Sequence, residues 1–315
     1  MEKNKTLPSP ALIMGLWQAG QTDWADIQPS DIEKAITYAI EAGVTMFDTA
    51  LSYGNGISEK IIGEISKRYL PEKICIATKV PLNALSNKEM EKACDTSLTH
   101  LQRDVIDVLF VHWPAGMFGT PKIPVEETAE AFLQLKQKGK IRFVGCSNFS
   151  TEKLLRFHSI LPIDVIQAPY SLFWRIAEKE SIRYATEENI PVWGYSPLAQ
   201  GILTGKFTNG NMPTDHRCRH RLLDKNVFPK VEHGLGKLKE IAGRKNVSLA
   251  QLALAWIYHQ KNITPILGVR NQKQLQEGLR AKDIILSDTD LKQIDLISTE
   301  IRRNLDNNPI QWHHR

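Results

Sequence analysis

The chain has 315 residues, of which 42% are hydrophobic and 24% charged, so it is long enough to bury one large core. Lys and Arg total 40 against 35 for Asp and Glu, and this mild, dispersed excess argues against a nucleic-acid-binding protein. The densest basic cluster, residues 216–221, suits a phosphate group better than a duplex. The chain shows no apolar signal segment, no run long enough to span a membrane, and no CxxC spacing among its four cysteines. We therefore expect a soluble, cytoplasmic protein with reduced thiols.

Strand-like and helix-like stretches alternate along the whole chain. Short runs of apolar and β-branched residues predict eight strands, at 11–17, 44–49, 74–80, 105–111, 141–147, 164–168, 191–195 and 264–269. Stretches with helical periodicity or helix-start signals lie between them and predict helices over 31–42, 58–69, 87–101, 125–138, a segment opening at 150–151, 177–188, 248–260 and a segment opening near 271.

Polar and glycine residues mark several of the helix ends. Ser30 and Glu33 predict a capping box at the start of the first helix, and Gly43 predicts its end. Ser58 and Ser248 are predicted N-caps of two later helices. These signals separate the helices from the strands that follow them.

Eight strands, most of them followed by a helix, favour a closed (β/α)8 TIM barrel formed by a single domain over residues 1–315. The alternative is an open doubly wound sheet, which would want a GxGxxG turn after an early strand, and the sequence has none. Residues 206–233 are long, polar and rich in turn residues, so we expect a functional loop over the carboxyl-terminal mouth of the barrel. The stretch after about residue 301 is expected to be irregular.

Four chemically active residues stand at or just beyond successive strand ends: Asp48, Tyr53, Lys79 and His112. In a barrel these ends converge at one mouth, where ligands bind. Lys79 within a buried strand needs a countercharge, which Asp48 can supply, and its own charge beside Tyr53 is expected to lower the pKa of the phenol. Taken singly, the residues fit a turn cap, a surface aromatic, an ion pair and a core histidine. Together they favour a catalytic group with Tyr53 as general acid.

The segments that carry these residues resemble those of the aldo-keto reductase superfamily, from about residue 7 to residue 298. FDTALSYGNGISE is similar to the family's DTAxxYGxGxSE signature, which places Asp48 and Tyr53 at the motif's catalytic positions. TKV carries the family's lysine as Lys79, and LFVHWP carries its histidine as His112. GKIRFVGCSNFS is similar to the family's GKIRxxGxSNF segment.

The resemblance implies NADPH as the cofactor. Ser147, Asn148 and Gln167 are implied to hydrogen-bond the nicotinamide carboxamide, and Tyr195 to stack on the nicotinamide. The family usually has asparagine after its final glutamate, where this chain has Gly278. The implied cofactor-binding residues are Trp17, Asp48, Ser147, Asn148, Gln167, Tyr195, Ser196, Pro197, Leu198, Gly201, Leu203, Lys206, Gly268, Arg270, Gln274 and Glu277.

Arg270 stands between the last strand and the helix that opens near residue 271. A helix N-terminus and a guanidinium together suit a phosphate, so we expect Arg270 to select NADPH over NADH. In the alternative, Arg270 only caps the barrel rim or pairs with Glu277 on the helix.

The resulting hypothesis is reduction of a small-molecule aldehyde or ketone, with Tyr53 as proton donor and His112 orienting the carbonyl oxygen. No metal, nucleic acid or membrane partner is expected, and the sequence leaves the substrate and the oligomeric state open. Two other functions compete with this hypothesis: a nucleotide-binding regulatory subunit similar to potassium-channel β subunits, and a metal-dependent barrel hydrolase, which the lack of an HxH pair disfavours. The candidate substrate-contacting residues are Trp17, Tyr53, His112, Trp113, Phe118 and Trp174.

Overall fold

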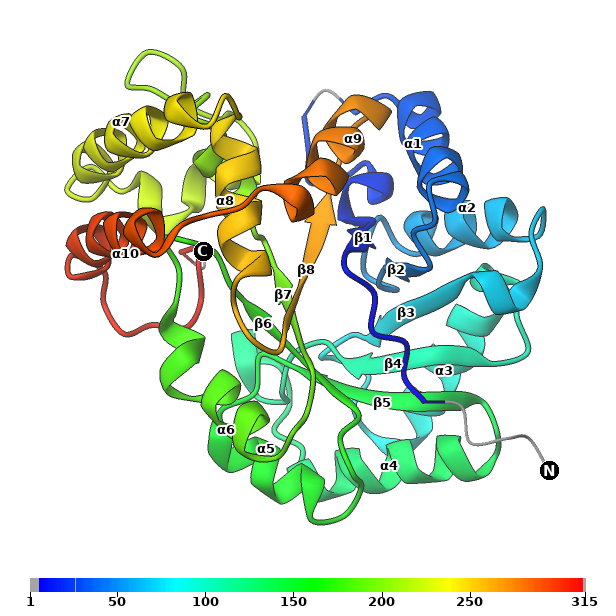
Figure 1. The fold of residues 1–315 in the computed structure, drawn as a ribbon. Helices are drawn as coiled ribbons and strands as arrows, with labels where there is room; N and C mark the ends of the chain where they lie inside the picture. Colours follow the sequence, from blue (N-terminus) through cyan, green and yellow to red (C-terminus); the bar gives the residue numbers. More distant parts are fainter. Residues whose placement is uncertain (1–5, 26, 314–315) are drawn as a thin grey trace.

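The computed structural model describes residues 6–25 and 27–313, so the first five residues of the polar amino-terminal stretch lie outside the described part. Eight parallel strands close into a barrel in which each strand pairs with the next and β8 pairs with β1 (Figure 1). The predicted (β/α)8 barrel is confirmed. Its strands are β1 (Ile13–Gly15), β2 (Met46–Asp48), β3 (Cys75–Val80), β4 (Ile106–Val111), β5 (Ile141–Ser147), β6 (Val165–Pro169), β7 (Val192–Tyr195) and β8 (Ile263–Gly268).

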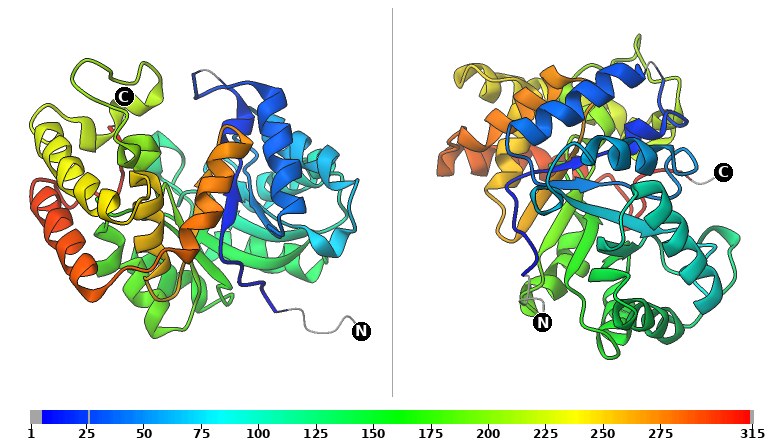
Figure 2. Two further views of the ribbon diagram at one scale, coloured as in Figure 1. Left: turned by 45° about the horizontal axis from the view of Figure 1, so that its top comes forward. Right: turned by 90° about the vertical axis from the view of Figure 1, so that its right-hand side faces the viewer.

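Helices cover the outside of the barrel, and the views in Figure 2 show them wrapped around the strands. Two of them, α7 and α10, had no counterpart among the predicted helices, and they lie side by side (Figures 1 and 2). The α-helices are α1 (Pro29–Glu41), α2 (Ile57–Ser66), α3 (Asn87–Leu101), α4 (Val125–Gln137), α5 (Thr151–His158), α6 (Ser181–Glu187), α7 (Phe228–Arg244), α8 (Leu249–Tyr258), α9 (Gln272–Arg280) and α10 (Asp288–Arg302).

Two of the predicted helix caps are wrong. Helix α1 begins at Pro29, a residue whose fixed φ and missing N–H suit the first helical position, so Ser30 and Glu33 lie inside the helix. Helix α2 begins after Gly56, and the Ser58 hydroxyl instead donates to the carbonyl of Leu16. Ser248, by contrast, is the N-cap of α8, as expected, and it also forms a capping box with Gln251.

Two segments also have different boundaries from those predicted. The loop expected over 206–233 ends earlier, because α7 starts at Phe228. The helix expected over 177–188 is split into a 3-10 turn, Ile176–Lys179, and the short α6. Beyond α10, residues 303–313 form no helix or strand, as expected.

The buried apolar side chains form two layers. The larger layer fills the space between strands and helices, where residues such as Phe47 and Leu109 point outward. The smaller layer fills the inside of the barrel, and its buried members are Ile13, Met46, Ala77, Val108, Phe110, Val165, Trp193 and Ile266. Because strand side chains alternate between the two sides, each strand feeds both layers.

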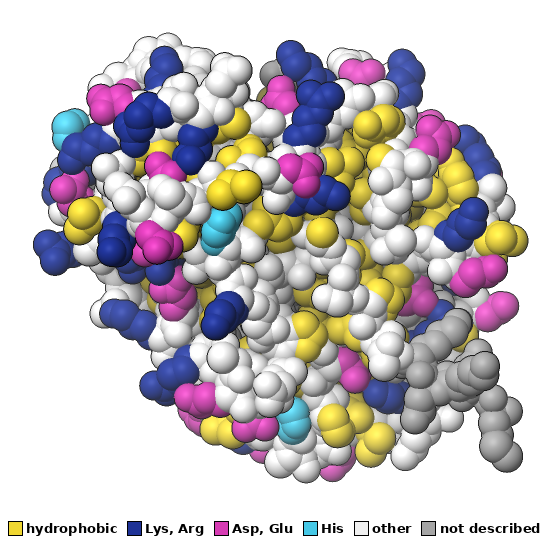
Figure 3. All heavy atoms as spheres, viewed as in Figure 1, with side chains coloured by type: hydrophobic (Ala, Val, Ile, Leu, Met, Phe, Trp, Pro, Cys, Tyr) yellow, Lys and Arg dark blue, Asp and Glu magenta, His cyan; other side chains and the backbone are white. Residues whose placement is uncertain are grey.

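On the face shown in Figure 3, basic and acidic side chains are interspersed over the helices. None of the helices in the described ranges is long and apolar enough to cross a membrane. Within the same residues, no group of three or more His, Cys, Asp or Glu side chains is arranged to hold a metal ion.

Candidate active site

A buried ion pair lies at the carboxyl ends of β2 and β3. Lys79 Nζ donates hydrogen bonds to Asp48 Oδ2 and to the carbonyl of Thr49, each at 2.7 Å. The two charged side chains are only 2% and 5% exposed. Burial lowers the pKa of Lys79, and the Asp48 carboxylate opposes that fall. Each charge therefore depends on the other, since removing one would leave its partner uncompensated in the barrel.

Tyr53 stands in the loop after β2, with its phenol oxygen 3.3 Å from Lys79 Nζ. The loop presses against the turn after β1, because a Cβ at Gly54 would lie 2.1 Å from the carbonyl oxygen of Gly20. The expected lowering of the phenol's pKa is wrong for this structure. Burial raises the pKa of Tyr53 well above its usual value, and the carboxylates of Asp48 and Asp23 raise it further. Tyr53 is therefore protonated at neutral pH and can donate its proton.

His112 follows β4 directly and forms the third side of this group. Its ring packs edge-on against Tyr53 with centroids 5.7 Å apart, and its Nδ1 lies 3.4 Å from Ser52 Oγ. Burial, together with the nearby Lys79 ammonium, lowers the pKa of His112 well below its usual value. The imidazole is therefore neutral and can donate a single N–H to an oxygen in the cavity.

Polar side chains from β5, β6 and β7 continue the site across the barrel mouth. Gln167 Nε2 donates to Asp48 Oδ1 at 2.6 Å, so this residue braces the ion pair. Asn148, in the left-handed region with φ 64°, donates to the carbonyl of His112 at 3.0 Å. The Tyr195 hydroxyl in turn donates to Asn148 Oδ1 at 2.7 Å. The residues implied to hold a nicotinamide are thus tied to one another and to the ion pair.

Three basic side chains gather at the opposite end of the site. Burial lowers the pKa of Lys206 to about 8, and the positive charges of Arg217 and Arg270 contribute to the shift. Arg217 is already paired with both oxygens of Asp215. At the start of α9, Asn271 caps the helix, so this end combines positive charge with a helix N-terminus.

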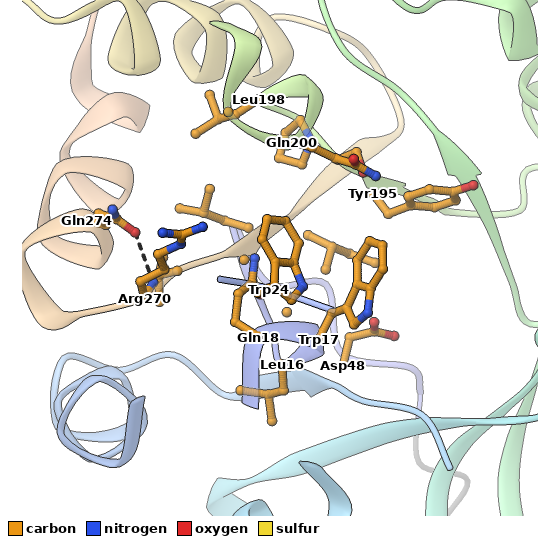
Figure 4. Close-up of a pocket in the computed structure, with 18 of the residues that line it drawn as sticks. Leu16, Trp17, Gln18, Trp24, Asp48, Tyr195, Leu198, Gln200, Arg270 and Gln274 are labelled. Carbon is orange, nitrogen blue, oxygen red and sulfur yellow. Dashed lines mark hydrogen bonds between the residues drawn. The ribbon is translucent and has the colours of Figure 1, made fainter. Parts of the chain in front are cut away.

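One cavity of about 630 Å³ joins the two ends. In Figure 4, Arg270 and Gln274 stand at one side, Asp48 and Trp17 at the other, and Trp24 lies between them. The predicted residues that line it are Trp17, Asp48, Tyr53, Lys79, His112, Trp113, Ser147, Asn148, Gln167, Tyr195, Ser196, Pro197, Leu198, Gly201, Lys206, Gly268, Arg270, Gln274 and Glu277.

Three predicted site residues lie outside this lining. Trp174 is fully buried in the outer core, where its ring packs edge-on against His220, and Leu203 is 1% exposed. Phe118 packs edge-on against Trp113, with centroids 5.1 Å apart, and does not itself line the cavity.

Comparisons with known proteins agree with this geometry. The family model described as "Aldo/keto reductase family" matches residues 11–299. The chain belongs to the aldo/keto reductase family. It is 34% identical over 297 residues to the aldo-keto reductase YhdN of Bacillus subtilis, covering 90% of this chain and 88% of that protein.

Solved structures extend the comparison to the fold. The glycerol dehydrogenase AKR11B4 of Gluconobacter oxydans superposes with a TM-score of 0.86 at 28% identity, covering 96% of both chains. An aldo-keto reductase from Klebsiella pneumoniae in complex with NADPH superposes with a TM-score of 0.75 at 25% identity, covering 97% of this chain and 95% of that one. The chain is accordingly an oxidoreductase of the kind that uses a nicotinamide cofactor.

The structure adds lining residues to this aldo-keto reductase that sequence reasoning missed. Trp24 lies over the cavity, with its ring 5.2 Å from the Arg217 guanidinium, and Trp312 of the carboxyl-terminal tail packs edge-on against Trp113 at 5.9 Å. The basic cluster at 216–221 had signalled Arg217. No local pattern marked Trp312, which reaches the site only because the tail folds back to pair with His220.

Gly278, where the family usually has asparagine, is explained by packing. It also lines the cavity, and a Cβ there would lie 2.2 Å from a methyl group of Leu267. Helix α9 can approach β8 closely because this position has no side chain.

Proposed function

We propose that this protein reduces aldehydes or ketones to alcohols, with NADPH as the hydride donor and Tyr53 as the general acid. One observation carries the proposal: the protonated phenol of Tyr53 faces the cavity while a buried ammonium, Lys79, lies 3.3 Å behind its oxygen. A phenol placed this way can give up its proton because the resulting phenolate is formed beside a positive charge.

Each neighbouring residue has a part in the same step. Asp48 and Gln167 hold Lys79 in place, and neutral His112 donates a hydrogen bond that orients the carbonyl oxygen toward Tyr53. The proton then passes from the phenol oxygen of Tyr53 to the substrate oxygen. Trp17, Trp113 and Trp312 line the cavity and exclude water from the reacting atoms.

The cavity also fits the cofactor. When bound, a nicotinamide cofactor supplies the hydride that reduces the carbonyl carbon. Ser147, Asn148 and Tyr195 would hold its nicotinamide end, and Lys206, Arg217 and Arg270 would hold its phosphates. Arg270 favours NADPH because a guanidinium binds a 2′-phosphate that NADH lacks.

A substrate panel tests this function. Purified protein is given NADPH and, in turn, aliphatic and aromatic aldehydes, ketones, sugars and pyridoxal, and the loss of NADPH absorbance is followed. We expect turnover on at least one carbonyl class, and at least about a hundredfold slower turnover with Tyr53→Phe, which keeps the ring and removes the proton. Equal turnover by both proteins would contradict the assignment of Tyr53, and binding of NADPH without turnover on any class would contradict the reductase function.

A further inference from the structure

A second carboxylate, Glu59, is completely buried on the outer side of β3. It lies in the first turn of α2 and is 0% exposed. Its Oε1 accepts a hydrogen bond of 2.6 Å from Thr78 Oγ1, and its Oε2 lies 3.0 Å from His100 Nδ1 of α3. Thr78 directly precedes Lys79 on β3, so its side chain and that of Lys79 leave the strand on opposite sides. Glu59 therefore stands behind the strand that carries the catalytic lysine.

The neighbouring residue on α2 links the same helix to the other side of the ion pair. The Ser58 hydroxyl donates to the carbonyl of Leu16 and lies 2.7 Å from Thr49 Oγ1. The carbonyl of Thr49 accepts a hydrogen bond from Lys79 Nζ. The first turn of α2 is thus hydrogen-bonded both to β3, which carries Lys79, and to Thr49 directly after β2.

We propose that Glu59 is a positioning residue for Lys79: from behind β3 it fixes the strand through Thr78 and supplies a second negative charge that keeps the lysine an ammonium. This inference rests on the proposed function, in which that ammonium stabilises the Tyr53 phenolate. A second charge matters because, without it, Asp48 alone would have to offset the loss of solvation of a fully buried lysine. A carboxylate is tolerated behind the strand because the Thr78 hydroxyl and the His100 ring contact its two oxygens. It also lies in the first turn of α2, at the positive end of the helix dipole.

The electrostatics of the surrounding groups agree with this arrangement. Glu59 raises the pKa of Lys79, although burial has the larger, opposite effect. On α3, burial raises the pKa of the Cys94 thiol to about 12, and the negative charge of Glu59 adds to this shift, so the thiol stays neutral. His100 is held tightly against α2, since a Cβ at Gly56 would lie 2.3 Å from its ring. Of the groups around Glu59, Lys79 is therefore the one whose charge bears on the reaction.

Glu59→Gln separates charge from structure, because its amide oxygen can still accept the Thr78 hydrogen bond. We expect Lys79 to lose its proton more easily, so the alkaline limb of the kcat/KM profile should move down by about half to one pH unit. Glu59→Asp, which keeps the charge, should leave that limb in place even if its shorter side chain lowers Tm. NADPH affinity should be unchanged in both variants.

Asp107→Asn is the matched control, since Asp107 is another buried carboxylate hydrogen-bonded to β3, through the Ile76 N–H. It should lower Tm without moving the alkaline limb. A Glu59→Gln variant that loses stability and keeps the wild-type profile would overturn the proposal and leave Glu59 purely structural.

A measurement without turnover keeps this test independent of the proposed function. In protein labelled with carbon-13 lysine, the Lys79 signal is assigned as the one missing from Lys79→Arg, and its titration is followed by NMR. A lower titration midpoint in Glu59→Gln supports the proposal even if no carbonyl is reduced. An unchanged midpoint overturns it even if the reductase assignment stands.

Discussion

The two ends of the barrel each contain a buried aspartate paired with a basic side chain, but the two pairs differ in what else they contact. At the carboxyl end, Asp48 is paired with Lys79, whose ammonium also reaches Tyr53 and the cavity. At the amino end, Asp107 on β4 accepts hydrogen bonds from the Ile76 N–H and from Arg142. Both aspartates hold strands together, but only the first connects to a proton that can be transferred.

The choice of cation explains much of this difference. An arginine stays charged whatever its surroundings, so the pair of Asp107 and Arg142 is a fixed structural brace. A lysine is more easily tuned by burial, and burial does lower the pKa of Lys79. The comparison predicts that substitutions at the carboxyl-terminal mouth change catalytic activity, and that substitutions at the amino end change the stability of the fold.

The largest effect is expected at the proton donor. Tyr53→Phe should lower kcat roughly 10²- to 10⁴-fold, the usual contribution of a general acid, while Tm and NADPH binding stay near wild type. Steady-state kinetics and cofactor titration measure these quantities. Near-normal turnover would remove the distinction between the two ends.

Lys79→Met should come next, with kcat lower by about a hundredfold. This substitution removes the ammonium beside Tyr53, so the limiting pKa of proton donation should rise. It also removes the Lys79 hydrogen bond to Asp48, whose hydrogen bond from Gln167 remains. The pH profile of the remaining activity is the decisive measurement. If only Tm fell and the profile stayed the same, Lys79 would be a brace like Arg142.

Arg270→Ala separates the effect of the phosphate-binding residues on cofactor affinity from the effect of the catalytic residues on kcat. A hydrogen bond to a charged group is worth about 1.5–3 kcal/mol, so NADPH should bind roughly ten- to a hundredfold more weakly. NADH should lose much less affinity, and kcat at saturating cofactor should hold. Fluorescence titration of both cofactors shows the difference, and equal weakening of the two would exclude Arg270 as the phosphate reader.

The same end of the cavity should make cofactor affinity depend on pH. Lys206, with a pKa near 8, is charged below that value and attracts phosphate, and it becomes neutral above it. The Kd for NADPH should therefore rise above pH 8, by up to about tenfold per pH unit. The rise should stop once the pH passes the pKa of Lys206 in the complex, which the bound phosphate raises. Lys206→Met should flatten the dependence, and an equally steep curve in that variant would point to another group.

The smallest effect on catalysis is expected at the amino end of the barrel. Asp107→Asn should destabilise the fold by about 1–3 kcal/mol, because it weakens the hydrogen bonds that Asp107 accepts from Ile76 and Arg142. Chemical denaturation measures this loss. Its kcat should stay within about twofold of wild type, and a larger fall would show that the two ends are coupled.

The barrel and the two members of its ion pair could be predicted from the sequence alone. Strand patterns depend on alternation and continuous apolar runs, which are local, so the predicted ends of all eight strands lie within two residues of the observed ones. The pairing of Asp48 with Lys79 followed from the high free energy of a lone buried charge, which leaves few alternatives.

The environment of these groups depends on contacts that form only in the folded chain. Ser58 is not a cap because its hydroxyl meets a carbonyl 42 positions earlier in the chain, and the pKa of Tyr53 rises because the folded loops bury it. Trp174, a predicted substrate contact, lies in the core, and Trp312, for which the sequence offers no prediction, lies in the cavity wall. Burial and contacts between distant segments leave no periodic trace in the sequence, so they are settled only when the chain has closed around them.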